Sequence, residues 1–358
     1  MNRAAQELPQ RILLVRFGAM GDIVHSLPAA AALRRQIPDA QIDWLVEERW
    51  RPLLEPGRTH FLDQVFSINT FEIRKHPLSR SSRNRVRTLL HALRERRYEV
   101  SVDLQGAVKS ALVCKLSGAP QIIGFSAPWL REKIAGFVYT NRVNSTATHI
   151  VDANMDLVST LYRNRLPISP RSPIEFPLSD GEPDSLPKEI PTSTFAVMNP
   201  GAGWRNKQWP LRSFSTLCDS LLSHHGMCTI LNCGPQEYAL GEQVRSGCEM
   251  AKPIIFTGSI SALIALLRKA SLMVGPDTGT MHLAAALGVP TIGIYGPTDP
   301  ARNGPYGPRV TSLRAANLVT THRRRTPPDG SMDAISPAMV LDEVAALLSR
   351  QPGLQFIR

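Results

Sequence analysis

The stretch FAVMNPGAGWRNKQWPLRSFSTLCDSLLSHHGMCTILNCG, residues 195–234, changes its hydrophobic pattern twice. Short apolar runs at 195–200 and 228–234 have the length and composition of buried strands. Between them, 210–226 repeats apolar side chains at helical spacing, and Pro210 stands in the expected first turn. A strand, a helix and a second strand in this order predict a parallel sheet with a right-handed crossover.

The same alternation continues in both directions from this stretch. Further strands are predicted at 11–17, 41–48, 100–106, 121–125, 254–258, 272–275 and 291–296. Helical patterns fill most of the intervals, and the one at 23–38 contains Pro28, which must begin a new turn or kink the helix. This pattern is typical of an α/β protein whose parallel sheets bind ligands beyond the carboxyl ends of their strands.

A linker is predicted at 179–193, SDGEPDSLPKEIPTS, where proline, serine and acidic residues accumulate. We therefore expect an N-terminal Rossmann-like domain at 1–178 and a C-terminal one at 194–358, which ends in a helix. Two such sheets facing each other would hold a ligand in the cleft between them.

The charge balance is basic, with 41 Lys and Arg against 30 Asp and Glu and a formal net charge of +11. Such a balance predicts an anionic partner, such as a phosphate, an acidic sugar or a lipid headgroup. We find neither zinc-finger spacing nor an RNA-binding signature, so no nucleic-acid partner is expected.

The N-terminus is polar, and no apolar run approaches the length of a membrane span. The 5 cysteines contain no Cys-x-x-Cys pair, which is typical of reduced thiols in a cytosolic protein. We therefore expect a cytoplasmic protein whose basic surface could still dock on a membrane.

The first motif is GAMGD at 18–22, directly after a predicted strand. Gly21 permits close approach of another backbone, and Asp22 then stands at the start of a helix. Asp22 could be an N-cap that only stabilises the helix, or a carboxylate presented to a ligand. The full GxGxxG pattern is absent, which argues against a nicotinamide enzyme.

Two motifs in the second half offer groups that bind phosphate. In NPGAGWRNKQWP, at 199–210, a glycine turn exposes backbone N–H groups and Lys207 adds a positive charge, although a flexible loop with a solvated lysine fits the same residues. In the motif at 275–300, Asp277 or Thr278 is expected to cap a helix whose first turn can bind an anion, with His282 one turn along. The alternative there is an ordinary capped helix with a buried histidine.

Polar groups also follow the strand at 100–106, in DLQGAVKSA. Asp103, Gln105 and Lys109 lie at this strand end, and Lys109 could reach an acidic acceptor or be an ordinary surface lysine. Two basic runs allow a similar pair of interpretations, a solvated face or a landing site for phosphorylated lipid. Their members are Arg74, Lys75, Arg80, Arg83, Arg85 and Arg87, and Arg323, Arg324 and Arg325.

Together, these motifs resemble the lipopolysaccharide heptosyltransferases of glycosyltransferase family 9, from Arg11 to about Tyr306. FGAMGDIVHSLPA, WLVEE and DLQGAVKSA are most like heptosyltransferase I, and DTGTMHLAAALGVPTIGIYGPTDP resembles the donor half of the family. The resemblance implies a GT-B fold, with an N-terminal acceptor domain and a C-terminal nucleotide-sugar domain. It also implies inverting transfer of L-glycero-D-manno-heptose from ADP-heptose to the Kdo of Kdo-lipid A, at the cytoplasmic face of the inner membrane, in lipopolysaccharide core synthesis.

The resemblance also assigns roles to individual residues. Asp22 matches the catalytic base, and Gly21, Asp103, Gln105 and Lys109 fall on the acceptor side. The donor positions are Lys207, Glu237, Asp277, Thr278, Gly279 and His282. No Asp-x-Asp occurs, so neither a metal nor another cofactor is expected. Arg16 departs from the pattern, because some members have lysine there.

Two rival functions remain at this point. One is heptosyltransferase II, or another GT-B transferase with a different nucleotide sugar. The other is a nucleotide-binding protein without catalysis that docks on membrane anions. Donor turnover with and without Kdo-lipid A would separate the enzyme from the binding protein.

Overall fold

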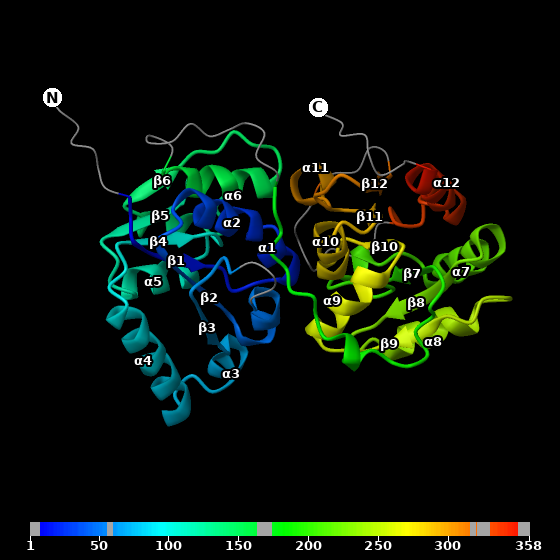
Figure 1. Ribbon diagram of the computed structural model, residues 1–358, viewed down its shortest axis with the longest axis horizontal. Helices are drawn as coiled ribbons and strands as arrows, with labels where there is room; N and C mark the ends of the chain where they lie inside the picture. The colour runs from blue at the N-terminus through cyan, green and yellow to red at the C-terminus, as the bar shows by residue number, and fades with distance from the viewer. Residues whose placement is uncertain (1–7, 56–59, 163–173, 316–319, 321–329, 350–358) are drawn as a thin grey trace. The chain divides into compact units, whose positions relative to one another are not determined.

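The computed structural model describes residues 8–55, 60–162, 174–315, 320 and 330–349, and the basic triplet at 323–325 lies outside them. The chain divides between Ser179 and Asp180 into two compact units. Each unit contains one six-stranded parallel sheet with helices beside it (Figure 1). The predicted fold class, two Rossmann-like parallel sheets, is therefore confirmed.

The sheet of the first unit has the order β3-β2-β1-β4-β5-β6. Its strands are β1 Arg11–Val15, β2 Gln41–Glu47, β3 Gln64–Ile68, β4 Val100–Asp103, β5 Gln121–Phe125 and β6 Asn141–Val143. In the centre, Ile12 of β1 lies opposite Ile42 on one side and Val100 on the other. These central strands are buried on both faces because helices cover both faces of the sheet.

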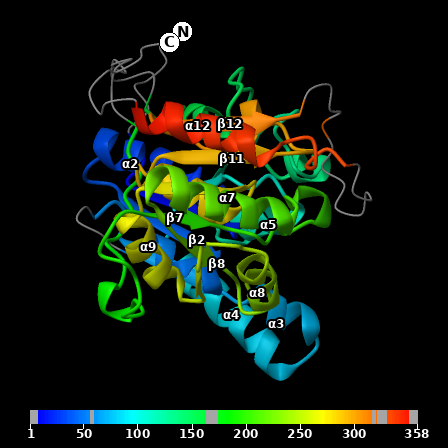
Figure 2. The same ribbon diagram turned by 90° about the vertical axis from the view of Figure 1, so that its right-hand side faces the viewer.

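The helices of the first unit are α1 Met20–Val24, α2 Leu27–Gln36, α3 Thr70–Lys75, α4 Arg80–Glu95, α5 Val108–Leu116 and α6 Ile150–Ser159, with 3-10 turns η1 Glu48–Leu54 and η2 Lys133–Phe137. The sequence left two alternatives for Pro28, the start of a new turn or a kink. Pro28 stands in the first turn of α2, so it begins a new helix. The loops after β1 and β4 lie next to each other, because these strands are neighbours. Figures 1 and 2 show α3 and α4 extending away from the sheet.

The sheet of the second unit has the order β12-β11-β10-β7-β8-β9. Its strands are β7 Phe195–Met198, β8 Cys228–Asn232, β9 Ile254–Phe256, β10 Leu272–Pro276, β11 Thr291–Tyr295 and β12 Val310–Arg314. Its helices are α7 Leu211–His225, α8 Tyr238–Ser246, α9 Ile260–Lys269, α10 Gly279–Ala286, α11 Pro300–Asn303 and α12 Pro337–Ser349, with 3-10 turns η3 Pro183–Ser185 and η4 Arg205–Lys207.

One core of the second unit is closed by α12, the last of the described helices. Val340, Val344 and Leu347 of α12 pack into the same cluster as Trp209 and Phe214. Trp209 is fully buried, and its indole N–H donates to the carbonyl of Ile335, 2.8 Å away. The loop that ends at Trp209 is therefore anchored to the segment that leads into α12.

The structure differs from the sequence-based expectation in three respects. The sequence pattern predicts helical character after Asn84, but helix α4 begins at Arg80. The Ser79 hydroxyl caps this earlier start by accepting from the Ser82 N–H at 3.0 Å. The predicted linker at 179–193 belongs mainly to the second unit, where the Glu182 N–H donates to the carbonyl of Ser261. Strands β3, β6 and β12 were not predicted at all.

Among the described helices, none has both the length and the hydropathy of a membrane-spanning segment.

Candidate active site

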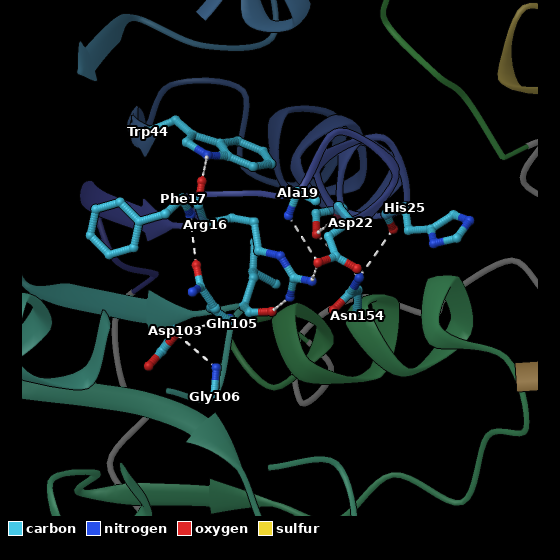
Figure 3. Close-up of polar contacts among 12 residues, drawn as sticks. Arg16, Phe17, Ala19, Asp22, His25, Trp44, Asp103, Gln105, Gly106 and Asn154 are labelled. Carbon is cyan, nitrogen blue, oxygen red and sulfur yellow. Dashed lines mark hydrogen bonds and ion pairs between the residues drawn. The ribbon is translucent and has the colours of Figure 1, made fainter. Parts of the chain in front are cut away.

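Asp22 projects from the short helix that follows the first strand. Ala19 is the N-cap of α1, so Asp22 is the third residue of the helix, and the N-cap alternative for Asp22 is wrong. Its carboxylate still stabilises the helix start, because it accepts from the Ala19 N–H at 3.0 Å. Gly21 lies buried immediately before it. The other end of α1 is held by Asn154, whose amide donates to the carbonyl of His25 (Figure 3).

Arg16 also holds the carboxylate of Asp22, at the same oxygen that the Ala19 N–H contacts. One guanidinium nitrogen, Nη2, lies 3.0 Å from Asp22 Oδ2 (Figure 3). The other, Nη1, donates to the carbonyl of Leu104. The side chain of Arg16 is only 8% exposed, whereas that of Asp22 is 40% exposed. A buried guanidinium is costly without partners, so Arg16 fixes Asp22 relative to the loop after β4 while the carboxylate stays open to solvent.

Asp103 supports that loop from inside. It is fully buried, and Oδ1 accepts from the N–H groups of Gln105 and Gly106 at 2.8 and 3.1 Å. Oδ2 accepts from the hydroxyls of Ser110 and Tyr139 at 2.8 and 2.7 Å. Burial raises the pKa of this carboxyl group. With its oxygens surrounded by donors inside the unit, Asp103 shapes the loop and is not presented to an acceptor.

Gln105 and Lys109 both reach the loop after β1. The side-chain carbonyl of Gln105 accepts from the Phe17 N–H at 2.8 Å. The ammonium group of Lys109 lies 4.3 Å from the centre of the Phe17 ring and 3.3 Å from the Thr70 hydroxyl. Partial burial lowers the pKa of Lys109, although the charge of Glu47 acts in the opposite direction. The structure thus gathers Asp22, Gln105 and Lys109 around one loop.

Asp277 is the centre of the polar cluster in the second unit. Its Oδ2 lies 2.5 Å from the ammonium of Lys207 and accepts from the Thr298 hydroxyl at 2.9 Å. Its Oδ1 lies 3.1 Å from His282 Nε2. Burial opposes the charge of Asp277, but the hydrogen bond with His282 and the positive charge of Lys207 outweigh burial and lower its pKa. Asp277 therefore remains an anion that joins the loops after β7, β10 and β11.

Thr278 directly precedes helix α10, but its side chain does not cap the helix. It occupies the N-cap position, and neither it nor Asp277 makes the expected side-chain capping bond. Within the described residues, its buried hydroxyl oxygen has no hydrogen-bond partner. Gly279 and Thr280 follow in the first turn, where backbone N–H groups lack intrahelical acceptors. This helix start can bind an oxyanion, with the ammonium of Lys207 on the neighbouring loop.

Glu237 lies against the glycine turn at the end of β7. Its Oε2 accepts from the Gly234 N–H at 2.9 Å. A Cβ atom added to Gly201 would lie 2.2 Å from Glu237 Oε1, so only glycine lets the two loops approach this closely. Glu237 was predicted from the resemblance alone, and the structure places it beside the turn that leads to Lys207.

Sequence reasoning missed three contributors to these clusters. Arg16 was noted only as a departure, and its contact with Leu104 depends on a strand 88 residues away in sequence. Thr298 lies in the polar turn GPTDP, but its hydrogen bond to Asp277 could not be inferred from the sequence. Asn232 donates to Asn199 and Thr280 at 2.8 and 3.2 Å, which connects the ends of β7 and β8 to α10.

The chain is similar to known proteins over most of its length. The model of "Glycosyltransferase family 9 (heptosyltransferase)" matches residues 86–332. Lipopolysaccharide heptosyltransferase 1 of Pseudomonas aeruginosa is 28% identical over 83% of this chain and 81% of its own length. Lipopolysaccharide heptosyltransferase 2 of Escherichia coli is 25% identical over 95% of this chain and 99% of its own length. The solved structure of E. coli heptosyltransferase WaaC with ADP has a TM-score of 0.77 at 25% identity, covering 94% of this chain and 99% of that one.

Proposed function

This chain belongs to glycosyltransferase family 9, the heptosyltransferases, and we propose that it transfers L-glycero-D-manno-heptose from ADP-heptose to the Kdo of Kdo-lipid A. The observation that carries this proposal is the family match, which spans parts of both units. The relative named heptosyltransferase 1 is more similar in sequence than the one named heptosyltransferase 2, which favours the first heptose of the lipopolysaccharide inner core.

In the proposed mechanism, Asp22 is the general base. A sugar hydroxyl is a poor nucleophile until its proton is withdrawn, and a carboxylate within hydrogen-bond reach can accept that proton. Asp22 suits this role because it is solvent-accessible yet held by Arg16 and by the Ala19 N–H. Attack of the hydroxyl oxygen on the anomeric carbon then breaks the bond to the diphosphate and inverts the configuration.

The second unit is proposed to bind ADP-heptose and stabilise the departing ADP. An ammonium group carries three N–H donors, so Lys207 can hold Asp277 and still donate to a phosphate oxygen. The Thr278 hydroxyl and the N–H groups at the start of α10 would share the remaining negative charge. Glu237 is proposed to lie near the nucleoside. The solved structure of a relative with ADP supports an ADP-sugar as the donor.

The first unit is proposed to bind the acceptor, at the cytoplasmic face of the inner membrane. Gln105 and Lys109 lie beside the Asp22 loop and could contact the acidic sugar. Asp103 contributes by holding the loop that carries Gln105. The expected partners are therefore ADP-heptose, Kdo-lipid A and the membrane surface.

A panel of nucleotide sugars assayed against Kdo-lipid A, with mass analysis of the product, tests the proposed function. A mass increase of one heptose, seen with ADP-heptose and absent with the other donors, is the expected result. Product formed only on an acceptor that already carries one heptose would favour heptosyltransferase II. Donor binding without turnover on either acceptor would favour a nucleotide-binding protein.

Arg16→Lys is expected to lower kcat by about fivefold with a smaller change in acceptor KM. Lysine keeps the positive charge but cannot reach both Leu104 and Asp22 as the guanidinium fork does. Initial rates measured with both substrates varied will separate the two constants. A lower unfolding temperature with unchanged kcat would mean that Arg16 only supports the fold.

The acceptor KM is expected to rise about threefold between roughly 50 and 300 mM salt, because salt screens exposed charges. The donor KM is the internal control, and we expect it to change less because Lys207 and Asp277 are nearly buried. An acceptor KM that is indifferent to salt would show that the basic residues of the first unit are ordinary surface.

A further inference from the structure

The basic excess of this protein is concentrated in one part of the chain. Residues 70–142 contain 14 Lys and Arg against 5 Asp and Glu, a net charge of +9, whereas the whole chain has +11. This segment includes α3, α4, α5 and η2 of the first unit. Helix α5 packs against η2 and also contacts the arginine-rich α4, so these elements are contiguous. The first unit therefore carries most of the positive field of the molecule.

Large apolar side chains are exposed within the same segment. Val108 and Leu112, one turn apart on α5, are 40% and 49% exposed. On the adjacent η2, Ile134 and Phe137 are 68% and 82% exposed. These four side chains define the α5–η2 face. Exposed apolar side chains that cluster in this way mark an interaction surface rather than ordinary scatter.

Cations accompany these apolar side chains. Lys115 lies on the same helix as Leu112, and Arg131 and Lys133 flank the start of η2. The guanidinium of Arg142 lies 5.9 Å from the centre of the Phe137 ring. Between residues 108 and 142 the acidic residue is Glu132, and its carboxylate accepts from the Val108 N–H at 2.8 Å. Apolar side chains accompanied by lysine and arginine are typical of segments that lie in the headgroup region of a bilayer.

We infer that the α5–η2 face docks this protein on an anionic lipid bilayer. Leu112, Ile134 and Phe137 enter the boundary between headgroups and acyl chains, and the surrounding cations contact lipid phosphates. Helix α5 begins directly after the loop that carries Gln105, so docking would bring the proposed acceptor loop to the membrane surface. The inference rests on the proposed function in one respect: the proposed acceptor is attached to a membrane lipid, so the enzyme must reach the membrane to use it.

The test is sedimentation of the full chain with vesicles that contain neither donor nor acceptor. The wild type is expected to bind phosphatidylglycerol vesicles, to bind pure phosphatidylcholine vesicles weakly, and to be released as salt rises. The triple variant Leu112→Ser, Ile134→Ser, Phe137→Ser should lower the partition coefficient by about tenfold or more. Its matched control replaces exposed apolar residues of the second unit, Tyr238→Ser, Met250→Ser and Met339→Ser, and should bind as the wild type does.

A charge series separates the two contributions to docking. Lys115→Glu, Lys133→Glu and Arg142→Glu together should abolish binding to phosphatidylglycerol vesicles. The matched control, Lys188→Glu, Arg212→Glu and Lys252→Glu, makes the same change in net charge on the second unit and should retain most of the binding. Equal losses in both variants would overturn the inference, because net charge alone would then explain the attraction.

Three other outcomes would also overturn it. In the first, the wild type does not bind anionic vesicles. In the second, the apolar triple variant binds them as well as the wild type does. In the third, the wild type is a dimer that does not bind vesicles, and the triple substitution converts it to a monomer. In the last case, the α5–η2 face would contact a second copy of the chain. Heptose transfer to detergent-dispersed acceptor is measured separately in the same variants, so a failure of the proposed function cannot be mistaken for a failure of docking.

Discussion

Asp22→Asn should lower kcat by roughly 10²–10⁴ while the protein still folds and binds ADP. An amide is nearly the same size as a carboxylate but cannot accept the proton of a sugar hydroxyl. The structure changes what is expected of stability, because Asp22 pairs with the buried Arg16. The variant should therefore unfold at a somewhat lower temperature than the wild type. The measurement is single-turnover and steady-state kinetics on the folded variant, with ADP affinity determined by calorimetry.

Glu72→Gln is the matched control for this variant. Glu72 is also the third residue of a short helix in the first unit, but it lies on α3 and its side chain is more exposed than that of Asp22. Its replacement should leave kcat unchanged. Turnover of Asp22→Asn within a few-fold of wild type would remove Asp22 as the base. Asp103 would not be the next candidate, because its carboxylate is fully buried among donors.

Lys207→Ala should weaken transition-state stabilisation by about 1.5–3 kcal/mol, which is roughly a 10- to 150-fold loss of kcat/KM for the donor. The ammonium is a charge-assisted donor to the proposed diphosphate, and its removal also leaves Asp277 without its cation. An uncompensated carboxylate next to a diphosphate repels it, so both effects act in the same direction. The donor KM and the calorimetric affinity for ADP should both become weaker.

Lys252→Ala serves as the control, since Lys252 is an exposed lysine of the same unit. The double variant Lys207→Ala, Asp277→Asn separates the two contributions. If repulsion by Asp277 causes part of the loss, the double variant should bind ADP better than Lys207→Ala alone. Donor kinetics that remain at the wild-type level in Lys207→Ala would exclude Lys207 from the donor site.

The strands that the sequence predicted are mainly those whose burial leaves a plain hydrophobic signal. β1, β4, β7 and β10 are buried along nearly their whole length, so they form short apolar runs between turns. The missed strands β3, β6 and β12 lie at the edges of their sheets and are partly exposed, and their residues mix polar with apolar. An edge strand is defined by pairing with its neighbour, which no local pattern records.

The candidate site shows the same division between local and distant information. Asp22, Lys207 and Asp277 were found because each follows a strand within a recognisable motif. The partners that orient them come from other strands, as Arg16 reaches Leu104 and Thr298 reaches Asp277. Asp103 was placed at the correct strand end, but its burial depends on Tyr139 from beyond the next strand. Position along one strand is therefore predictable, whereas the direction of a side chain depends on its neighbours.

The bond between Trp209 and Ile335 has a consequence for biosynthesis. A chain leaves the ribosome from its N-terminus, and domains generally fold as units while synthesis proceeds. The first unit can complete its core early, but the cluster around Trp209 stays open until Val340, Val344 and Leu347 have emerged. Lys207 lies two residues before Trp209, so its loop gains a firm anchor only after α12 has emerged. A nascent chain that stalls shortly before α12 would expose an unfinished core, which is the kind of surface that chaperones and proteases recognise.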